Sequence, residues 1–409
     1  MRWFRPLALL MLATSTAAAA DWPQWLGPNR DGATAEKVAP WKGQLIVAWR
    51  KAVGEGHSSP VVSNGKVYLH YRVPNKESEA VECFEAATGK QLWLNEYQRD
   101  AFKGLFGSGP RGTPAVVEGK IYSFGPTGIL TCTETATGKT VWQSDTRKVF
   151  NSPKLTFGDS TSPLVVGNKV LVNVGAKGAS VVAFDKDKGD VLWKSLDDAA
   201  SYSSPILMGK DKNQSVVFLT QLGVVGLNVD DGALQWRFPF KDKLFESSTT
   251  PIRVGDKLLV SSISLGTAFL DIENKDGKMA ANQLWKTDAL TCYFSTPVPV
   301  GTDHVYLVTG SPIPGGKSSL HCVDAKTGKA LWSKGGVGKY HASLMRTGDN
   351  KLLMVEEAGN LVFIDPDPKA YKELARAKIC GNTWAHPALA DGRLYIRDDK
   401  ELVCVEVGK

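Results

Sequence analysis

The stretch A-T-G-K-Q-L-W, from Ala87 to Trp93, returns along the chain as A-T-G-K-T-V-W at Ala136–Trp142 and as K-T-G-K-A-L-W at Lys326–Trp332. Its core is a glycine followed four residues later by a tryptophan. Further copies are Gly189–Trp193, Gly232–Trp236 and a longer version, Gly277–Trp285. Successive tryptophans lie roughly 43 to 51 residues apart, which is the period expected of propeller blades.

A second marker accompanies each repeat: a small or hydroxylated residue before a proline, followed by apolar residues. Its copies begin at Ser58, Gly112, Thr161, Ser203, Thr249, Ser295 and, in weaker form, His341 and Ala385. The serines and threonines of this marker, such as Ser58 and Ser203, are predicted to make local turn bonds. The eight copies predict eight blades.

Each repeat contains four short apolar runs separated by turns such as Asn64-Gly65, which is a hairpin signal. The third run ends in an acid, as at Glu85, and this acid is expected to accept hydrogen bonds from the amides of the T-G turn. Four strands make one blade, and the stacking of blades requires large apolar side chains between them. The outer tryptophans are therefore predicted to be structural: Trp49, Trp93, Trp142, Trp193, Trp236, Trp285 and Trp332.

The last marker is followed by only three runs. The missing fourth strand is predicted to be Leu45–Arg50, so the N-terminal strand would complete the C-terminal blade and close the ring without a long exposed edge. The seventh repeat lacks a tryptophan, and its outer strand is predicted at Ala375–Ile379. The fold expected is all-β, an eight-bladed β-propeller of four-stranded antiparallel blades.

The N-terminus predicts export. Arg2 and Arg5 precede a short apolar run and small residues, the pattern of a signal peptide cleaved near Ala20. No other segment approaches 18 apolar residues, so no transmembrane segment is expected. The predicted divisions are a signal peptide at 1–20, an N-terminal extension at 21–44 and the propeller at 45–409. The mature chain is expected to be periplasmic or secreted, and a monomer.

The distribution of charge and the positions of the cysteines bear on two further questions, whether the chain binds nucleic acid and whether it forms disulfides. The formal net charge of +7 is spread along the 409 residues without a basic cluster, so no nucleic-acid partner is predicted. Exported chains often form disulfides, but most of the six cysteines here occupy one repeated position of the third strand, too far apart on neighbouring blades for the required Cα separation. We expect mostly free, buried thiols at Cys83, Cys132, Cys292, Cys322, Cys380 and Cys404.

The A-x-T-G-K-x-x-W repeat resembles that of the pyrroloquinoline quinone (PQQ)-like propellers, the quinoprotein dehydrogenase-like superfamily. The opening D-W-P-Q-W-L-G-P-N-R-D-G, Asp21–Gly32, is similar to the segment that precedes the ring in compact exported bacterial members. The resemblance covers nearly the whole chain after the predicted leader. It implies either a PQQ- and calcium-dependent oxidoreductase or a scaffold that binds no quinone.

Departures from the dehydrogenase pattern favour a binding protein over a quinone-dependent enzyme. Many quinoproteins hold PQQ against a disulfide between adjacent cysteines, and this chain has neither a Cys-Cys pair nor a C-x-x-C-H haem motif. The resemblance also implies calcium ligands that cannot be placed here residue by residue. We therefore expect a ligand- or protein-binding scaffold with no firm cofactor, PQQ with calcium being the alternative and a glycan-acting hydrolase or lyase a third reading.

The site is predicted at the mouth of the central channel, because the loops leading into the inner strands gather there. Their side chains are His57, Arg111, Asp159, Tyr202, Glu246, Tyr293, Tyr340, His341, Asn382, Trp384 and His386. Aromatic walls with a few polar groups are typical of ligand sites. Asp159 or Glu246 opposite a histidine could form an acid/base pair, and His57, His341 and His386 could hold a metal. Capping of strand ends is the competing interpretation.

Overall fold

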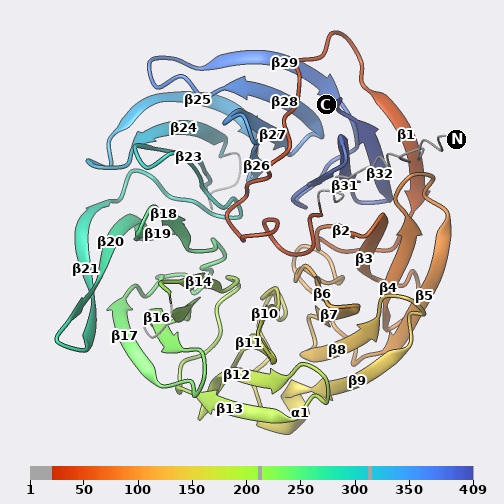
Figure 1. The fold of residues 1–409 in the computed structure, drawn as a ribbon, viewed down its shortest axis with the longest axis vertical. Coiled ribbons are helices and arrows are strands. Elements are labelled where there is room, and N and C mark those ends of the chain that lie inside the picture. Colours follow the sequence, from red (N-terminus) through yellow and green to blue (C-terminus); the bar gives the residue numbers. More distant parts are fainter. Residues whose placement is uncertain (1–20, 211–213, 312–315, 409) are drawn as a thin grey trace, which may run out of the picture.

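The computed structural model describes residues 21–210, 214–311 and 316–408, so the predicted signal peptide lies outside the described residues. Eight four-stranded antiparallel sheets are arranged as blades around a central channel (Figure 1). The eight-bladed propeller predicted from the repeat is thus confirmed. One short helix, α1 (Thr146–Phe150), occurs in the described chain, and none of its helices is long and apolar enough to cross a membrane.

The first four blades follow one another along the chain, and each runs from its innermost to its outermost strand. Blade 1 consists of β2 (Val61–Ser63), β3 (Lys66–Arg72), β4 (Ser78–Glu85) and β5 (Gln91–Gln98). Blade 2 consists of β6 (Ala115–Val117), β7 (Lys120–Phe124), β8 (Ile129–Glu134) and β9 (Thr140–Asp145). Blade 3 consists of β10 (Leu164–Val166), β11 (Lys169–Ala176), β12 (Ala179–Asp185) and β13 (Val191–Ser195). Blade 4 consists of β14 (Ile206–Met208), β15 (Ser215–Leu219), β16 (Gly223–Asn228) and β17 (Leu234–Pro239).

The remaining blades continue this order until the ring closes. Blade 5 consists of β18 (Ile252–Val254), β19 (Lys257–Ser262), β20 (Gly266–Lys275) and β21 (Lys278–Thr287). Blade 6 consists of β22 (Val298–Val300), β23 (His304–Thr309), β24 (Ser318–Asp324) and β25 (Ala330–Gly338). Blade 7 consists of β26 (Ala342–Arg346), β27 (Leu352–Glu356), β28 (Asn360–Asp365) and β29 (Lys372–Lys378). Blade 8 consists of β30 (Ala388–Ala390), β31 (Arg393–Arg397), β32 (Glu401–Glu406) and β1 (Ile46–Ala52).

The ring closes as the sequence predicted. Strand β1 pairs antiparallel with β32, and Trp49 lies opposite Cys404. The outer strand of blade 7 begins at Lys372, three residues before the predicted start at Ala375. Ala375 there takes the place of the tryptophan, opposite Phe363, and Trp41 of the N-terminal extension stacks on Phe363 at 5.8 Å.

A contact between neighbouring blades explains why glycine and tryptophan recur together. The Trp93 indole N–H of blade 1 donates to the Thr135 carbonyl of blade 2 over 3.0 Å. A Cβ atom on Gly138, whose φ is 75°, would lie 2.6 Å from the Trp93 ring. The corresponding indole bonds end on the carbonyls of Ala86, Lys186, Val229, Ala325 and Asp367. Glycine thus lets the next blade's turn lie flat on the indole.

Among the outer tryptophans, Trp236 at the contact between blades 4 and 5 is the exception. Blade 5 carries the lengthened repeat, and its turn glycine, Gly277, has no atom within 4 Å of an added Cβ. Trp236 of blade 4 therefore lacks a turn to bind, and its N–H lies 3.3 Å from the Ser215 hydroxyl of its own blade. The insertion moves the turn beyond the reach of the indole.

The acids at the end of the third strand behave in two ways. Asp324 accepts a hydrogen bond from the Thr327 amide at 2.7 Å, as predicted. The prediction is wrong for Glu85 and Glu134, whose carboxylates accept from the hydroxyls of Thr88 and Thr137. The longer glutamate side chain extends past the amide to the threonine of the turn.

Hydroxyls before the prolines link the inner strands around the channel. The Ser59 amide donates to the Thr113 hydroxyl, the Thr113 amide to the Ser162 hydroxyl and the Ser162 amide to the Ser204 hydroxyl, over 2.9–3.0 Å. Each of these bonds joins one blade to the next. The expectation of local turn bonds is therefore wrong for these hydroxyls. The Ser58 hydroxyl donates to the His70 carbonyl of its own blade, and the Ser203 hydroxyl contacts both the adjacent Ser204 carbonyl at 3.5 Å and the Thr249 carbonyl of the next blade at 2.9 Å.

The six cysteines are all buried and free, as expected. In blade 1, Cys83 lies between Tyr68 of β3 and Trp93 of β5 in the strand register. The apolar core is spread around the ring between adjacent blades. One cluster, for example, joins Leu130 of blade 2 to Val172 of blade 3.

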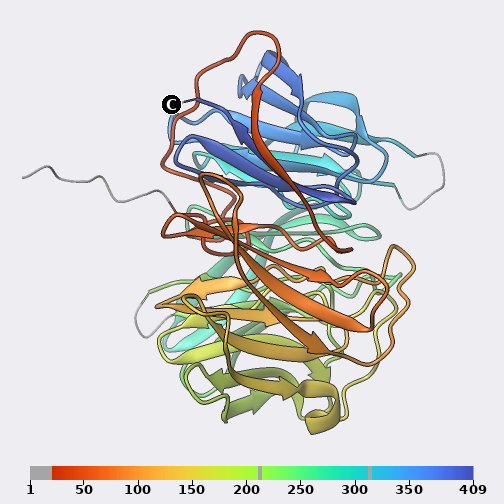
Figure 2. The same ribbon diagram turned by 90° about the vertical axis from the view of Figure 1, so that its right-hand side faces the viewer.

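The N-terminal extension runs across the channel (Figure 1) and lies toward one face of the ring (Figure 2). Trp22 pairs with Val62 of blade 1, and the buried Arg30 guanidinium donates to the Ser162 and Pro163 carbonyls of blade 3. Its contacts extend to blades 7 and 8 through Thr34 and Glu36.

Candidate functional site

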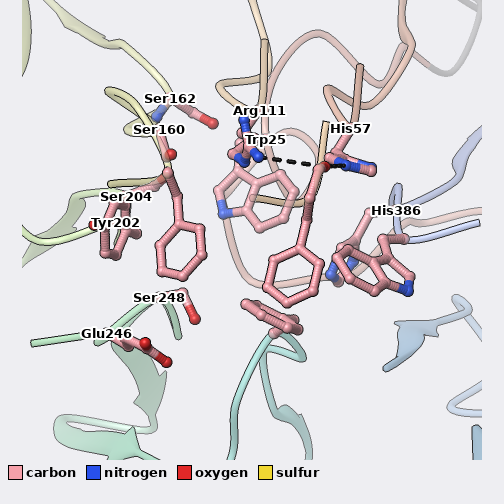
Figure 3. A pocket seen from close by; sticks show the side chains of 14 residues that line it. Trp25, His57, Arg111, Ser160, Ser162, Tyr202, Ser204, Glu246, Ser248 and His386 are labelled. Atoms are coloured by element: carbon pink, nitrogen blue, oxygen red, sulfur yellow. Dashed lines mark hydrogen bonds between the residues drawn. The ribbon is translucent and has the colours of Figure 1, made fainter. Parts of the chain in front are cut away.

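A pocket lies at the channel mouth where the loops enter the inner strands (Figure 3). Its empty volume, with the open mouth included, is about 800 Å³. The lining residues are Trp25, His57, Phe106, Arg111, Phe157, Ser160, Ser162, Tyr202, Ser204, Glu246, Ser248, Phe294, Trp384 and His386. We call this pocket the funnel.

One wall of the funnel is a stack of aromatic rings. Trp384 lies between His57, at 5.3 Å, and Phe294, at 5.2 Å, with nearly parallel planes, and Tyr293 stacks behind Phe294 at 3.8 Å. The Trp384 indole is held from behind by the Glu357 carboxylate at 2.8 Å. Phe106 presents its edge to this stack, 5.1 Å from Trp384. Offset and edge-to-face contacts of this kind add stability beyond area burial, so the wall is preorganised.

Polar groups lie on opposite sides of these rings. Arg111 donates to the Phe106, Gly107 and Gly109 carbonyls, and burial lowers its pKa to about 10, so it stays charged at neutral pH. Glu246, on the other side in Figure 3, accepts a hydrogen bond from the Tyr293 hydroxyl at 2.5 Å. The funnel thus offers one cation and one anion beside apolar walls.

Two further histidines lie near the inner end of the funnel. His386 contacts the edge of Trp25 at 4.6 Å and the His341 ring at 5.5 Å. The Nε2 atoms of both histidines are buried without a hydrogen-bond partner in the described chain. Burial lowers the pKa of His386 well below its ordinary value and that of His341 to about 4. These rings are therefore neutral at pH 7.

The structure brings together some of the predicted site residues and separates others. Those lining the funnel are His57, Arg111, Tyr202, Glu246, Trp384 and His386. Tyr293, Tyr340 and His341 contact the lining residues from behind. Asn382 is exposed outside the lining, and Asp159 is buried against Arg147 at 2.9 Å.

The predicted acid/base pairs are not formed. Burial raises the pKa of Asp159 to about 7, although its ion pair with Arg147 opposes the shift. Arg147 belongs to α1, so this carboxylate joins the helix to the loop that enters blade 3. Glu246 is bonded to Tyr293. No described contact joins either carboxylate to a histidine, and the hypothesis of a carboxylate–histidine pair is therefore not supported by the geometry.

Several lining residues escaped the sequence analysis. Phe106, Phe157 and Phe294 lie in the loops that enter the inner strands, at positions other than those predicted from the register. Trp25 comes from the N-terminal extension, and its indole donates to the Thr250 hydroxyl at 2.9 Å. The glycine-rich run K-G-L-F-G-S-G, Lys103–Gly109, was the available signal, since such a loop can bring a ring close to other backbone.

The neutral histidines predict a pH dependence. His341 is 1 % exposed, and its pKa is lowered from about 6.5 to about 4 by burial, against the opposing effect of Glu357. The unfolded chain therefore binds this proton at a higher pH than the folded chain does. The contribution of neutral His341 to the free energy of unfolding is complete above pH 6.5 and is lost as the pH falls toward 4. We expect this histidine to account for a loss of up to about 3 kcal/mol.

Chemical denaturation at pH 7, 6 and 5 measures this loss. The free energy of unfolding of the unaltered protein should fall more steeply with acid than that of His341→Gln, whose amide can still bond to Ser295. Parallel curves for the two proteins would contradict the assignment.

The described funnel residues do not fit a quinone cofactor with its metal. Among residues 21–210, 214–311 and 316–408, no group of three or more His, Cys, Asp and Glu side chains could hold a metal ion. His57, His341 and His386 therefore do not form the metal site considered above. PQQ carries three carboxylates, whereas the lining offers Arg111 as a cation beside neutral histidines and the acidic Glu246. A buried anion needs matching donors or counter-charges.

Comparisons with known proteins agree with this fold. The family model described as outer membrane protein assembly factor BamB matches residues 76–334. A relative of that name from Burkholderia pseudomallei is 23% identical over 360 residues, covering 85% of this chain and 84% of the relative.

Two solved structures share the architecture. Quinohemoprotein alcohol dehydrogenase from Comamonas testosteroni has a TM-score of 0.67 at 16% identity, covering 95% of this chain and 81% of that one. BamB from Moraxella catarrhalis has a TM-score of 0.60 at 14% identity, covering 88% and 99%. At such identities the structural likeness shows the fold alone. Because the family model spans more than half of the chain, the protein belongs to this BamB-like family of PQQ-like β-propellers.

Proposed function

We propose that this chain is a binding scaffold that holds a partner protein through its funnel. The observation that carries the proposal is the preorganised aromatic wall around Trp384, placed between Arg111 and Glu246 at an open mouth. Large aromatic side chains in a partly buried pocket are typical anchors of protein interfaces. The family name adds support, since the relatives are named as assembly factors of outer membrane proteins.

The same relationship supports a location for the scaffold. Proteins named as outer-membrane assembly factors work in the periplasm or at the outer membrane, which agrees with the export predicted from the first 20 residues. We therefore propose a periplasmic or outer-membrane-associated monomer whose partner is another protein of that compartment.

Site-specific photo-crosslinking tests the proposal. A photoreactive phenylalanine analogue replaces Tyr202 in the funnel, and in a matched variant it replaces Leu331, which is 45% exposed on an outer strand. We expect a partner protein to be crosslinked from Tyr202 and not from Leu331. Trp384→Ala should weaken that interaction by about 2 kcal/mol or more, roughly 30-fold.

The outcome that contradicts the proposal is equally concrete. Crosslinking from Leu331 alone would place the partner outside the funnel, and crosslinking from Tyr202 that is unchanged by Trp384→Ala would show that the aromatic wall does not hold the partner. Circular dichroism of each variant verifies that the ring has folded.

A further inference from the structure

Phe106 occupies the middle of the funnel, although it belongs to a surface connection. It lies in the segment between β5 and β6, and its ring contacts Phe157, Phe294 and Trp384 at 5.1–6.3 Å. These three rings come from loops that enter blades 3, 6 and 8. A single side chain of one connection thus meets residues from distant parts of the ring.

The backbone of Phe106 is bound as well as its ring. Its carbonyl accepts hydrogen bonds from His57 Nε2 at 2.7 Å and from the Arg111 guanidinium at 3.3 Å. A carbonyl only accepts, so Nε2 carries the proton, and the pKa of His57, lowered to about 4 mainly by burial, leaves Nδ1 free of a proton at neutral pH. The funnel therefore holds the Phe106 ring together with the carbonyl oxygen of the same residue.

The rest of the connection is rich in glycine, and beyond Phe106 it is held by hydrogen bonds from the Ser108 amide to Glu55 and from Arg111 to the Gly107 and Gly109 carbonyls. Leu105, next to Phe106, is 70% exposed, and Gly104, Gly107 and Gly109 surround the two residues. Gly107 has a φ of 96°. Glycines lose more conformational freedom on ordering than other residues. Ordering this connection with Phe106 in the funnel therefore carries a large entropy cost. An equivalent ring from another chain can compete with it.

We propose that the funnel is a receptor for an aromatic residue in a peptide segment of the partner, and that Phe106 is its intramolecular stand-in. The proposal rests on the binding function proposed above and names the chemistry that the funnel recognises. The incoming ring takes the place of Phe106 against Phe294 and Trp384, and its carbonyl takes the bonds from His57 and Arg111. The Phe106 connection then moves out to solvent.

The chain's own loop supplies the probe. A fluorescein-labelled, capped peptide with the sequence K-G-L-F-G-S-G of Lys103–Gly109 is titrated, by fluorescence polarisation, with the unaltered protein, Phe106→Ala and Leu105→Ala. We expect Phe106→Ala to bind at least tenfold more tightly than the unaltered protein, since removal of an internal competitor raises the competent fraction. Leu105→Ala, in the same loop but exposed, should bind like the unaltered protein. A peptide with alanine in place of phenylalanine should not bind.

Two further variants locate the peptide. In the Phe106→Ala background, Phe294→Ala should weaken binding at least tenfold, and Leu331→Ala on the outer strand should not change it. The proposal is overturned if folded Phe106→Ala binds no more tightly than the unaltered protein, or binds both peptides equally. Crosslinking of a partner from Tyr202 together with that negative result would leave the binding function standing and remove only its aromatic specificity.

Discussion

Replacing Arg99 by methionine should lower the free energy of unfolding by about 3–5 kcal/mol, the cost of leaving a buried charge without its partner. The Arg99 side chain is fully buried at the end of β5, where it lies 3.3 Å from the Glu79 carboxylate. Glu79 is also fully buried, and its other oxygen contacts His70 at 3.2 Å and the Tyr97 hydroxyl at 2.9 Å. Methionine fills much of the same volume but provides no positive charge.

The position of this cluster connects it to the funnel. Glu79 faces blade 2, where a Cβ on Gly125 would lie 2.2 Å from the carboxylate, so the ion pair is enclosed between the two blades. Arg99 also lies 5.9 Å from the Phe102 ring, at the start of the connection that carries Phe106. Loss of Arg99 should therefore loosen that connection in addition to destabilising the ring.

Urea denaturation of three variants tests this account. Arg99→Met should be strongly destabilised, and Arg99→Met combined with Glu79→Gln should recover much of the loss because the unpaired charge is gone. Arg72→Met, which breaks half-exposed ion pairs with Glu55 and Glu77, should cost no more than about 1 kcal/mol. A double variant as unstable as Arg99→Met would show that packing, rather than charge, dominates.

Gly138→Ala should cost about 2–5 kcal/mol, because two penalties combine at this turn. A residue with a Cβ is strained by about 1–2 kcal/mol in the left-handed region, where Gly138 has a φ of 75°. The added methyl would also lie 2.6 Å from the Trp93 ring, and overpacking of this kind costs about 1–3 kcal/mol. The contact between blades 1 and 2 must open to accommodate it.

Gly277→Ala is the matched control. Gly277 has a φ of 80° in the equivalent turn of blade 5, but nothing lies within 4 Å of an added Cβ. Only the backbone strain of about 1–2 kcal/mol remains there. Thermal unfolding should place Gly138→Ala well below Gly277→Ala, and equal midpoints would mean that the indole contact contributes little to the strength of the ring.

The repeat made the fold predictable because its two markers report on different physical requirements. The glycine and tryptophan mark contacts between blades at the outer strands, and the hydroxyl–proline pair marks the inner strands. Eight inner markers with only three strands after the last one required a strand from elsewhere, and β1 supplies it. Only local details differed, such as the start of β29 at Lys372.

The candidate site was predictable only in part. The register placed His57 and Trp384 at the mouth because each precedes an inner strand. It does not predict how far a loop between two blades extends into the funnel. Phe106 enters the funnel through a connection whose length no periodicity fixes, and Trp25 arrives from outside the repeat. Asp159 satisfied the register, yet Arg147 from α1 holds it away as an ion pair.

The pairing of β1 with β32 has a consequence for the order in which the molecule can fold. Residues 46–52 are synthesised well before their hydrogen-bonding partners at 401–406, and Arg50 and Glu401, for example, are 351 residues apart. Blades 1 to 7 contain only strands that are near in sequence, so each can fold as the chain is synthesised. The pairing of β1 with β32 has a very high sequence separation, and its loop-closure entropy is lost only when β32 has been made. Until then β1 is an unpaired strand, and the side chain of Trp49, which is buried in the folded ring, is exposed to other chains. Aggregation during synthesis should therefore depend on how long β1 waits for its partner.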